Sequence, residues 1–262
     1  MKAIILFLLV SIPSIGTSKP SINIDVQGRA FDLDSGELVY QEFHCIDLDN
    51  KQRIVEYYDD TNKKILSKWL DYKGGLSTPS MIQIDAVLEE TVAMSLVGNS
   101  VNMFSDDISE SLSIKVDTRV PLVIDAGFDN FIRDYWAELI EGRTIVFQFP
   151  VVARKSIFNF EVKASNCRYD NQQDQCFSME PASWLLSALL DPIELGYDKN
   201  SRQLNRYRGL SNVEDRNGSG YEVDIHYEYQ TVSARQCDAV DVDALWAKTL
   251  PSPLEIIEDN KK

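Results

Sequence analysis

Apolar and polar residues alternate along most of the chain, a period of two that is typical of β-strands with one buried face. The alternation is clearest over 221–229, where Tyr, Val and Ile residues alternate with Glu, Asp and His. Polar turn sequences, such as 59–62, separate the runs and favour short antiparallel connections. The predicted strands are 38–47, 52–58, 65–72, 81–88, 91–97, 100–104, 112–116, 143–150, 156–167, 175–179, 193–197, 203–208 and 221–230.

One segment has a spacing of three to four residues instead, which predicts a long amphipathic helix over 126–141. Asp125 is suited to cap its first turn, and Gly142 is suited to end it. A shorter apolar helix is expected at 184–190. The apolar face of the long helix carries Phe128, Phe131, Ile132, Tyr135, Trp136, Leu139 and Ile140.

These elements predict a mainly β fold (α+β) in which one curved antiparallel sheet, a half-barrel of about ten strands, holds one long and one short inserted helix. A sheet with this many strands curls, so we expect it to wrap around the aromatic helix. Its concave face would then form an apolar ligand pocket together with the helix. The expected pocket residues are Phe128, Phe131, Ile132, Tyr135 and Trp136.

The first residues have the three parts of a secretory signal peptide: a lysine, a short apolar run and then small residues. The alternative is a membrane anchor, but the apolar run is shorter than the roughly 20 residues that a transmembrane helix needs. We therefore expect a signal peptide at 1–18, a single β-rich domain at 19–250 and a flexible, charged tail at 251–262. The mature protein would be periplasmic or secreted, with no transmembrane segment.

The charge balance is acidic, with 41 Asp and Glu against 26 Lys and Arg and a formal net charge of −15. Such a field repels phosphate backbones and anionic lipid surfaces, so nucleic acid is a poor candidate partner. The simplest interpretation of the charge is solubility. A hydrophobic fraction of 44% is typical of a globular domain and argues against disorder.

The chain has four cysteines, an even number that indicates disulfides in an oxidising compartment. Cys167 and Cys176 flank a polar turn sequence, and two hairpin strands joined there would bring them to bonding distance. Cys45 and Cys237 remain for a second bridge, which is possible by elimination only. A zinc site would need closely spaced ligands, and the only two histidines are remote in sequence. We expect no metal and no cofactor.

Tyr40, Glu42 and His44 share one face of their predicted strand, and Lys68 can join that face from a neighbouring strand. Glu42 and His44 are therefore weak candidates for general acid–base catalysis. The alternative, which we favour, is a structural polar cluster. His226 lies on the acidic face of its strand and is expected at the surface. Asp125 and the nearby Asp129 are explained by the positive end of the helix dipole.

Several segments resemble those of uncharacterised bacterial periplasmic proteins: 40–44, 125–131, 190–198 and 207–212. At the level of architecture, the strand count and the inserted helix resemble the curved half-barrels of the periplasmic lipoprotein carriers LolA and LolB. That resemblance is one of architecture only and assigns no functional residue. The expected apolar pocket would suit a lipid, an acyl chain or a hydrophobic peptide.

We therefore expect a protein that binds or carries a hydrophobic small molecule. One alternative is an envelope protein that binds a protein partner and no ligand. A third is a hydrolase using the Glu42–His44 pair, which is disfavoured because the chain lacks nucleophile-elbow and zinc-protease motifs. An open apolar cavity would favour the carrier, and a sealed core would favour the interaction protein.

Overall fold

The computed structural model describes residues 22–106, 111–188, 190–229 and 236–237. The predicted signal peptide at 1–18 and the predicted tail at 251–262 lie outside these residues. No helix in the described ranges is long or apolar enough to span a bilayer.

The described chain forms one antiparallel sheet whose path contains fourteen strands in the order β8-β7-β6-β5-β4-β3-β2-β1-β14-β13-β12-β11-β10-β9, with β15 pairing β1 beside it. Nearly every strand pairs with its neighbour in sequence, as short connections require. The strands are β1 (Ile22–Asp32), β2 (Leu38–Asp47), β3 (Gln52–Asp59), β4 (Lys64–Asp71), β5 (Ser80–Asp85), β6 (Glu90–Val97), β7 (Ser100–Ser105), β8 (Leu112–Lys115), β9 (Ile145–Val151), β10 (Ser156–Ser165), β11 (Asp174–Pro181), β12 (Ile193–Asp198), β13 (Leu204–Glu214), β14 (Gly220–Tyr229) and β15 (Gln236–Cys237).

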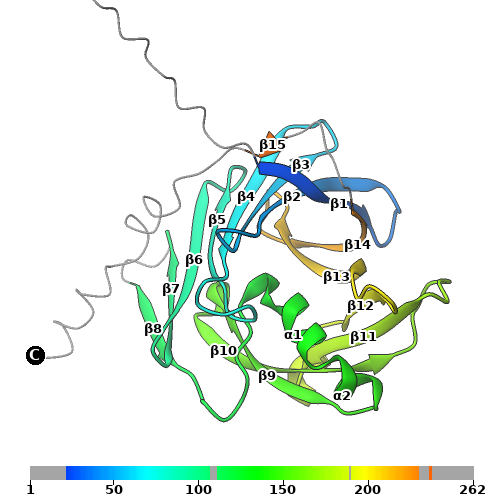
Figure 1. Ribbon diagram of the computed structural model, residues 1–262. Helices are drawn as coiled ribbons and strands as arrows, with labels where there is room; N and C mark the ends of the chain where they lie inside the picture. Colours follow the sequence, from blue (N-terminus) through cyan, green and yellow to red (C-terminus); the bar gives the residue numbers. More distant parts are fainter. Residues whose placement is uncertain (1–21, 107–110, 189, 230–235, 238–262) are drawn as a thin grey trace, which may run out of the picture.

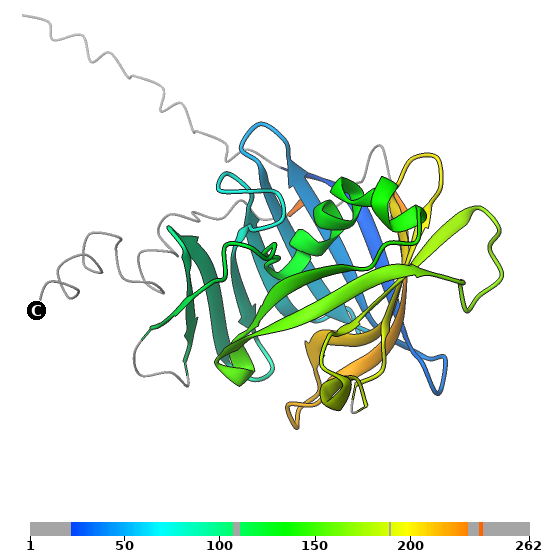
Figure 2. The same ribbon diagram turned by 90° about the horizontal axis from the view of Figure 1, so that it is seen from below.

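The sheet curls into a ring that leaves its two end strands, β8 and β9, unpaired with each other (Figures 1 and 2). Apolar side chains close this gap, because Ile114 of β8 packs in one cluster with Val152 and Ile157 from the other side. The segment that follows β8 crosses the gap and is held by the side chain of Gln148 from β9. Its side-chain amide donates to the carbonyls of Asp117 (2.8 Å) and Val120 (3.0 Å) and accepts from the Asp117 amide at 2.9 Å.

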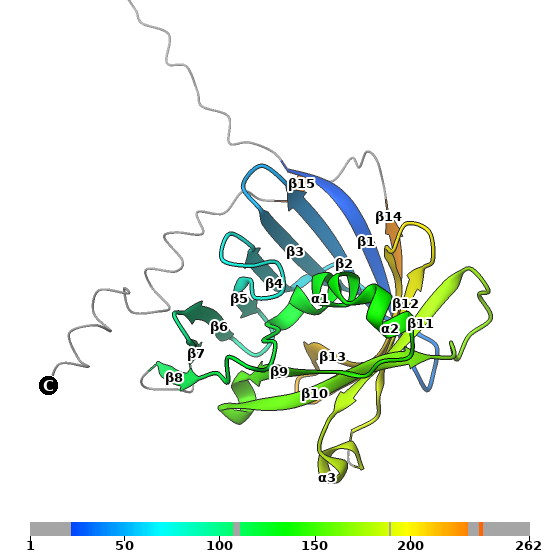
Figure 3. The ribbon, with the colours of Figure 1, turned by 60° about the horizontal axis from the view of Figure 1, so that its bottom comes forward.

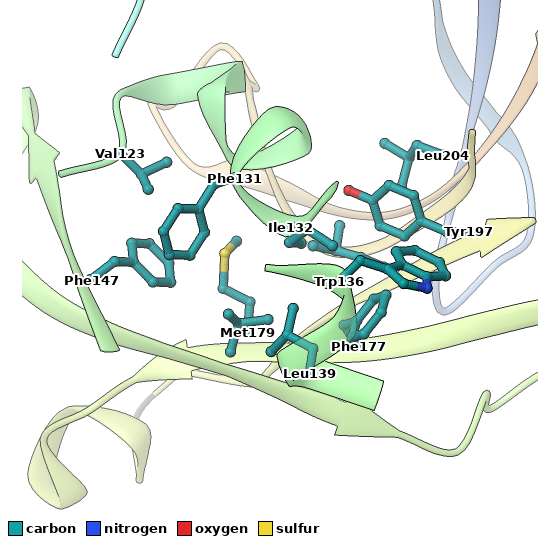
Figure 4. Close-up of a cluster of buried hydrophobic side chains, with 12 residues drawn as sticks. Val123, Phe131, Ile132, Trp136, Leu139, Phe147, Phe177, Met179, Tyr197 and Leu204 are labelled. Atoms are coloured by element: carbon teal, nitrogen blue, oxygen red, sulfur yellow. The ribbon is translucent and has the colours of Figure 1, made fainter. Parts of the chain in front are cut away.

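The main helical segment lies inside one end of the ring (Figures 1 and 3). It consists of a 3-10 turn η1 (Asp125–Gly127), α1 (Phe128–Asp134) and α2 (Trp136–Ile140). Its large side chains pack on β9, β11 and β12 in the cluster shown in Figure 4. The ring of Phe131 lies 5.0 Å from that of Phe147, and the ring of Trp136 lies 5.1 Å from that of Phe177. Each such side chain contributes roughly 1.5–3 kcal/mol by burial.

The prediction of a mainly β, curved antiparallel fold is confirmed, but the strand count and the helices differ from it. The path has fourteen strands rather than about ten. Thirteen of them, β2 to β14, correspond to predicted segments, and β1 was assigned to no element. The long helix is broken at Tyr135, which has φ −93° and ψ 12°. The break lets Phe131 face β9 while Trp136 faces β11 and β12. The second helix, α3 (Trp184–Ser187), is shorter than expected, and a second 3-10 turn, η2 (Val152–Arg154), follows β9.

Two disulfides join the four cysteines. Cys167 and Cys176 close a short loop beside the hairpin of β10 and β11. Cys45 of β2 bonds Cys237 of β15, so the second bridge spans 192 positions in sequence. It anchors β15 beside β1, near the seam between the first and last parts of the chain.

We expect the two bridges to differ in their contribution to stability, because cross-linking a longer loop removes more entropy from the unfolded chain. Chain-entropy estimates give about 5 kcal/mol for the Cys45–Cys237 loop and about 2.6 kcal/mol for the Cys167–Cys176 loop. Denaturant unfolding of the Cys45→Ala/Cys237→Ala and Cys167→Ala/Cys176→Ala double variants measures both. Equal losses would contradict the loop-entropy account.

The helix should depend on Trp136, which is 5% exposed, and much less on Ile140, which is 53% exposed. Trp136→Ala is expected to lower the free energy of unfolding by about 3–5 kcal/mol through the cavity that it leaves. Ile140→Ala, on the same helix, should change it by no more than about 0.5 kcal/mol. Urea unfolding curves compare the two, and similar losses would show that the helix face is assigned incorrectly.

Candidate functional site: a cavity inside the ring

A cavity of about 380 Å³ remains inside the ring, between the sheet and the start of the helical segment. Its walls are mainly apolar and come from both halves of the chain. Exposed residues near α3 form part of its rim, among them Leu190, Asp191, Leu210 and Glu222, so the cavity opens to solvent there. The apolar wall includes Val26, Val55, Leu70, Phe160, Met179 and Ile225.

A row of polar side chains interrupts this apolar wall on the first strands of the sheet. Glu42 and His44 of β2 point inward with Tyr40, as the period of two predicted. In the strand register His44 pairs with Val55 of β3, and Val55 pairs with Lys68 of β4. Glu42, His44 and Lys68 are all buried, and all three line the cavity. The three side chains therefore lie on one polar face of the sheet, as the sequence pattern predicted.

Gly28 of β1 allows Glu42 to meet Tyr227 of β14, because it lies between them in the register. A Cβ at Gly28 would lie 2.6 Å from the Glu42 Cγ atom and 2.9 Å from the Tyr227 ring. Burial would raise the pKa of Glu42, but the neighbouring His44, Tyr227 and Lys68 hold it below its usual value. Glu42 is therefore kept as a buried carboxylate.

Glu42 and His44 are neighbours, but no hydrogen bond joins them as it would in a working acid–base dyad. The His44 Nε2 atom lies 3.7 Å from Glu42 Oε1. Both ring nitrogens of His44 are covered by protein and have no hydrogen-bond partner in the described chain. The hydroxyl of Ser211, which also lines the cavity, is engaged with the Tyr40 hydroxyl at 2.8 Å and accepts from the Val213 amide at 2.9 Å. A nucleophile–base pair is thus not assembled here.

Lys68 forms a buried ion pair with Asp125, with its Nζ atom 2.9 Å and 2.8 Å from the two carboxylate oxygens. Asp125 was predicted to cap the helix. Instead, its backbone takes a positive φ of 46° at the 3-10 turn, and its carboxylate accepts from the adjacent Ala126 amide. Asp129, which also lines the cavity, pairs with Arg133 one turn later at 2.8 Å, as its helical spacing allows.

Arg53 of β3 also lines the cavity, and sequence analysis did not single it out. The period of two over 52–58 places it on the same face as Val55 and Tyr57, which is the signal that would have found it. Within the part of the chain that the structure describes, its guanidinium forms no hydrogen bond and no ion pair within 4 Å. The charge of Asp129 reaches it only over a longer distance.

Of the five residues expected to form the pocket, the structure places only Phe128 on the cavity wall. Phe131, Ile132 and Trp136 are buried in the cluster between the helix and the sheet, and Tyr135 packs against that cluster. Of the residues predicted on the apolar face of the helix, Phe131, Ile132, Trp136 and Leu139 are buried, whereas Ile140 is 53% exposed. The buried side chains are covered by Phe147, Phe177 and Tyr197, which fill the space where the pocket was expected.

The remaining candidates lie away from the cavity. His226 is on the outer face of β14, with its Nε2 atom 3.3 Å from the Asp224 carboxylate, and is exposed as expected. Over the described ranges, no group of three or more His, Cys, Asp or Glu side chains is arranged to hold a metal ion.

Comparisons with known proteins find a likeness in structure alone. No model of a known protein family matches the chain, and no curated protein matches it. A crystal structure described as a beta-barrel-like protein of domain of unknown function DUF1849, from Brucella abortus, is similar with a TM-score of 0.47 and 7% identity. The alignment covers 80% of this chain and 99% of that one. The resemblance to LolA and LolB stays a prediction, and the function of the cavity has to be argued from its own residues.

We expect Gly28→Ala to destabilise the protein, because the new Cβ would displace Glu42 and Tyr227. Overpacking of this kind costs about 1–3 kcal/mol, whereas alanine is ordinarily better than glycine within a strand. Gly74→Ala is the matched control, since nothing lies within 4 Å of its added Cβ. Thermal and urea unfolding measure both variants. A Gly28→Ala protein as stable as the wild type would contradict the assigned contact.

Proposed function

We propose that this protein is a periplasmic or secreted binding protein that holds or carries a hydrophobic ligand, such as a lipid or acyl chain, in the cavity of its ring. The single observation that carries the proposal is a mainly apolar cavity of about 380 Å³ that opens to solvent. Ligand sites commonly have this character: a concave apolar wall with a small number of polar groups. A sealed core would instead have favoured an interaction protein without a ligand.

The location is supported by the cysteines, because all four are joined in disulfides. Disulfides persist in oxidising compartments and are rare in the cytosol. The proposed role is of the same kind as that of the periplasmic lipoprotein carriers LolA and LolB, whose architecture the sequence resembles. A cavity with a mainly apolar wall and a solvent-exposed rim suits such a role.

A second candidate is a hydrolase, which is favoured by one observation: Glu42 and His44 both lie on the cavity wall. General acid–base catalysis needs an imidazole nitrogen within hydrogen-bond reach of the substrate or of a water. Both nitrogens of His44 are covered, so the binding function is the better supported of the two.

The proposal predicts that the protein purified from a periplasmic extract carries a lipid-sized adduct in native mass spectrometry, and that the emptied protein binds a fluorescent fatty acid. Val151→Trp, on the cavity wall of β9, should weaken probe binding at least about tenfold by filling the cavity. Val146→Trp is the control, because Val146 lies on the same strand and is exposed.

An unliganded mass together with no probe binding by the wild-type protein would overturn the proposal. Undiminished binding by a folded Val151→Trp protein would place the ligand elsewhere. The same preparations should be incubated with p-nitrophenyl esters. Turnover that is lost in Glu42→Gln, a variant that keeps the shape of the side chain, would support the hydrolase instead.

A further inference from the structure

We infer that the ligand of the cavity is an anionic amphiphile whose carboxylate or phosphate head group binds Arg53, with its apolar tail along the cavity wall. This inference rests on the proposed function and specifies the chemistry of the ligand. The inference is based on a comparison of the charged groups in the cavity: most have a partner within the protein, and one does not.

Most charged groups that line the cavity have partners within the protein. Lys68 is held by both oxygens of Asp125, at 2.9 and 2.8 Å. Asp129 is paired with Arg133 at 2.8 Å. Glu42 lies against His44, 3.7 Å away. Each of these groups therefore has a polar or charged neighbour within the protein.

Arg53 differs from these groups. It lines the cavity and is only partly buried, yet in the described ranges of the chain its guanidinium has neither a hydrogen bond nor an ion pair. A cation in a largely apolar space is costly unless an anion accompanies it. The planar guanidinium presents two parallel N–H donors that match a carboxylate or a phosphate. The geometry therefore offers an anion site that no side chain of the described chain fills.

The surroundings of Arg53 suit an amphiphile rather than a small free anion. Its partner in the strand register is Leu70, and the next inward residue along β3 is Val55, and both line the cavity. Tyr72 and Tyr229 lie within electrostatic range of the guanidinium, and the Tyr72 hydroxyl is buried without a hydrogen-bond partner in the described residues. The tail of a ligand whose head group binds Arg53 would lie directly against the apolar wall.

The inference is tested by measuring dissociation constants, by calorimetry, for dodecanoate, dodecyl phosphate, dodecanol and inorganic phosphate. Wild-type protein should bind both anionic amphiphiles about ten- to a hundredfold more tightly than dodecanol, because hydrogen bonds to charged groups contribute about that much. Arg53→Gln should remove this difference and leave dodecanol binding unchanged. Arg53→Lys should retain part of it. Inorganic phosphate should bind far more weakly than dodecyl phosphate if the ligand is an amphiphile.

Arg119→Gln is the control for net charge, because Arg119 pairs with Asp117 and its side chain is 87% exposed. It should bind every ligand as the wild type does. Arg53→Gln should also melt as the wild type does, since it breaks no ion pair, whereas Lys68→Gln should melt earlier. If Arg53→Gln fails to fold, the preference of the wild type for dodecanoate over dodecanol still tests the inference.

The outcomes separate the two proposals. Equal binding of dodecanol and dodecanoate by the wild-type protein, or unchanged selectivity in Arg53→Gln, would overturn the anion site and leave the proposed function in place. Phosphate binding as tight as that of dodecyl phosphate would overturn the amphiphile and assign a free anion. If none of the three amphiphiles binds, both the inference and the proposed function fail.

Discussion

The antiparallel pairing of β1 with β14 is the interaction on which the structure depends. Strands β1 to β8 and strands β9 to β14 each form by local hairpin pairing, and this seam joins the two groups into a ring. It brings Val26 opposite Tyr229, about as far apart in sequence as the described chain allows. Closing such a long loop is entropically costly, so the seam needs reinforcement. The Cys45–Cys237 disulfide supplies it by fixing β15 beside β1.

The same seam creates the polar part of the cavity. Gly28 sits in it with no side chain, so Glu42 from one group of strands reaches Tyr227 from the other. The ion pair of Lys68 with Asp125 then ties the sheet to the start of the helical segment. Buried ion pairs add little net stability, because desolvation offsets most of their attraction, but they penalise any arrangement that separates the partners. Here the Lys68–Asp125 pair holds the helical segment in one position inside the end of the ring.

Periodicity in the sequence reports which face of a strand or helix is buried, and this limits how much of the structure it predicts. The bounds of β2 were predicted from a run of apolar and β-forming residues that ends just before a turn at Asp49 and Asn50. Alternation alone would not have found this strand, because residues 42–45 are all buried. Residues 22–32 alternate, but they follow an apolar N-terminal run and were assigned to no element. Periodicity showed that Phe131 and Trp136 would be buried, but it cannot show whether a buried face meets a cavity or another side chain. Arg53 was missed because a single inward charge resembles an ordinary solvent-facing one until the partners across the ring are known.

In a closed barrel, strand number and stagger fix the diameter, because backbone hydrogen bonds run around the whole circumference. In this ring, no backbone ladder joins β8 to β9. That stretch of the circumference is held by packed side chains such as Ile114, Val152 and Ile157, and by hydrogen bonds of Gln148 to the chain that crosses the gap. Van der Waals contacts lack the directional spacing of a hydrogen-bonded ladder. The circumference of the ring is therefore not fixed by strand pairing at this point, so that widening the ring for a bulkier ligand needs no pair of strands to separate.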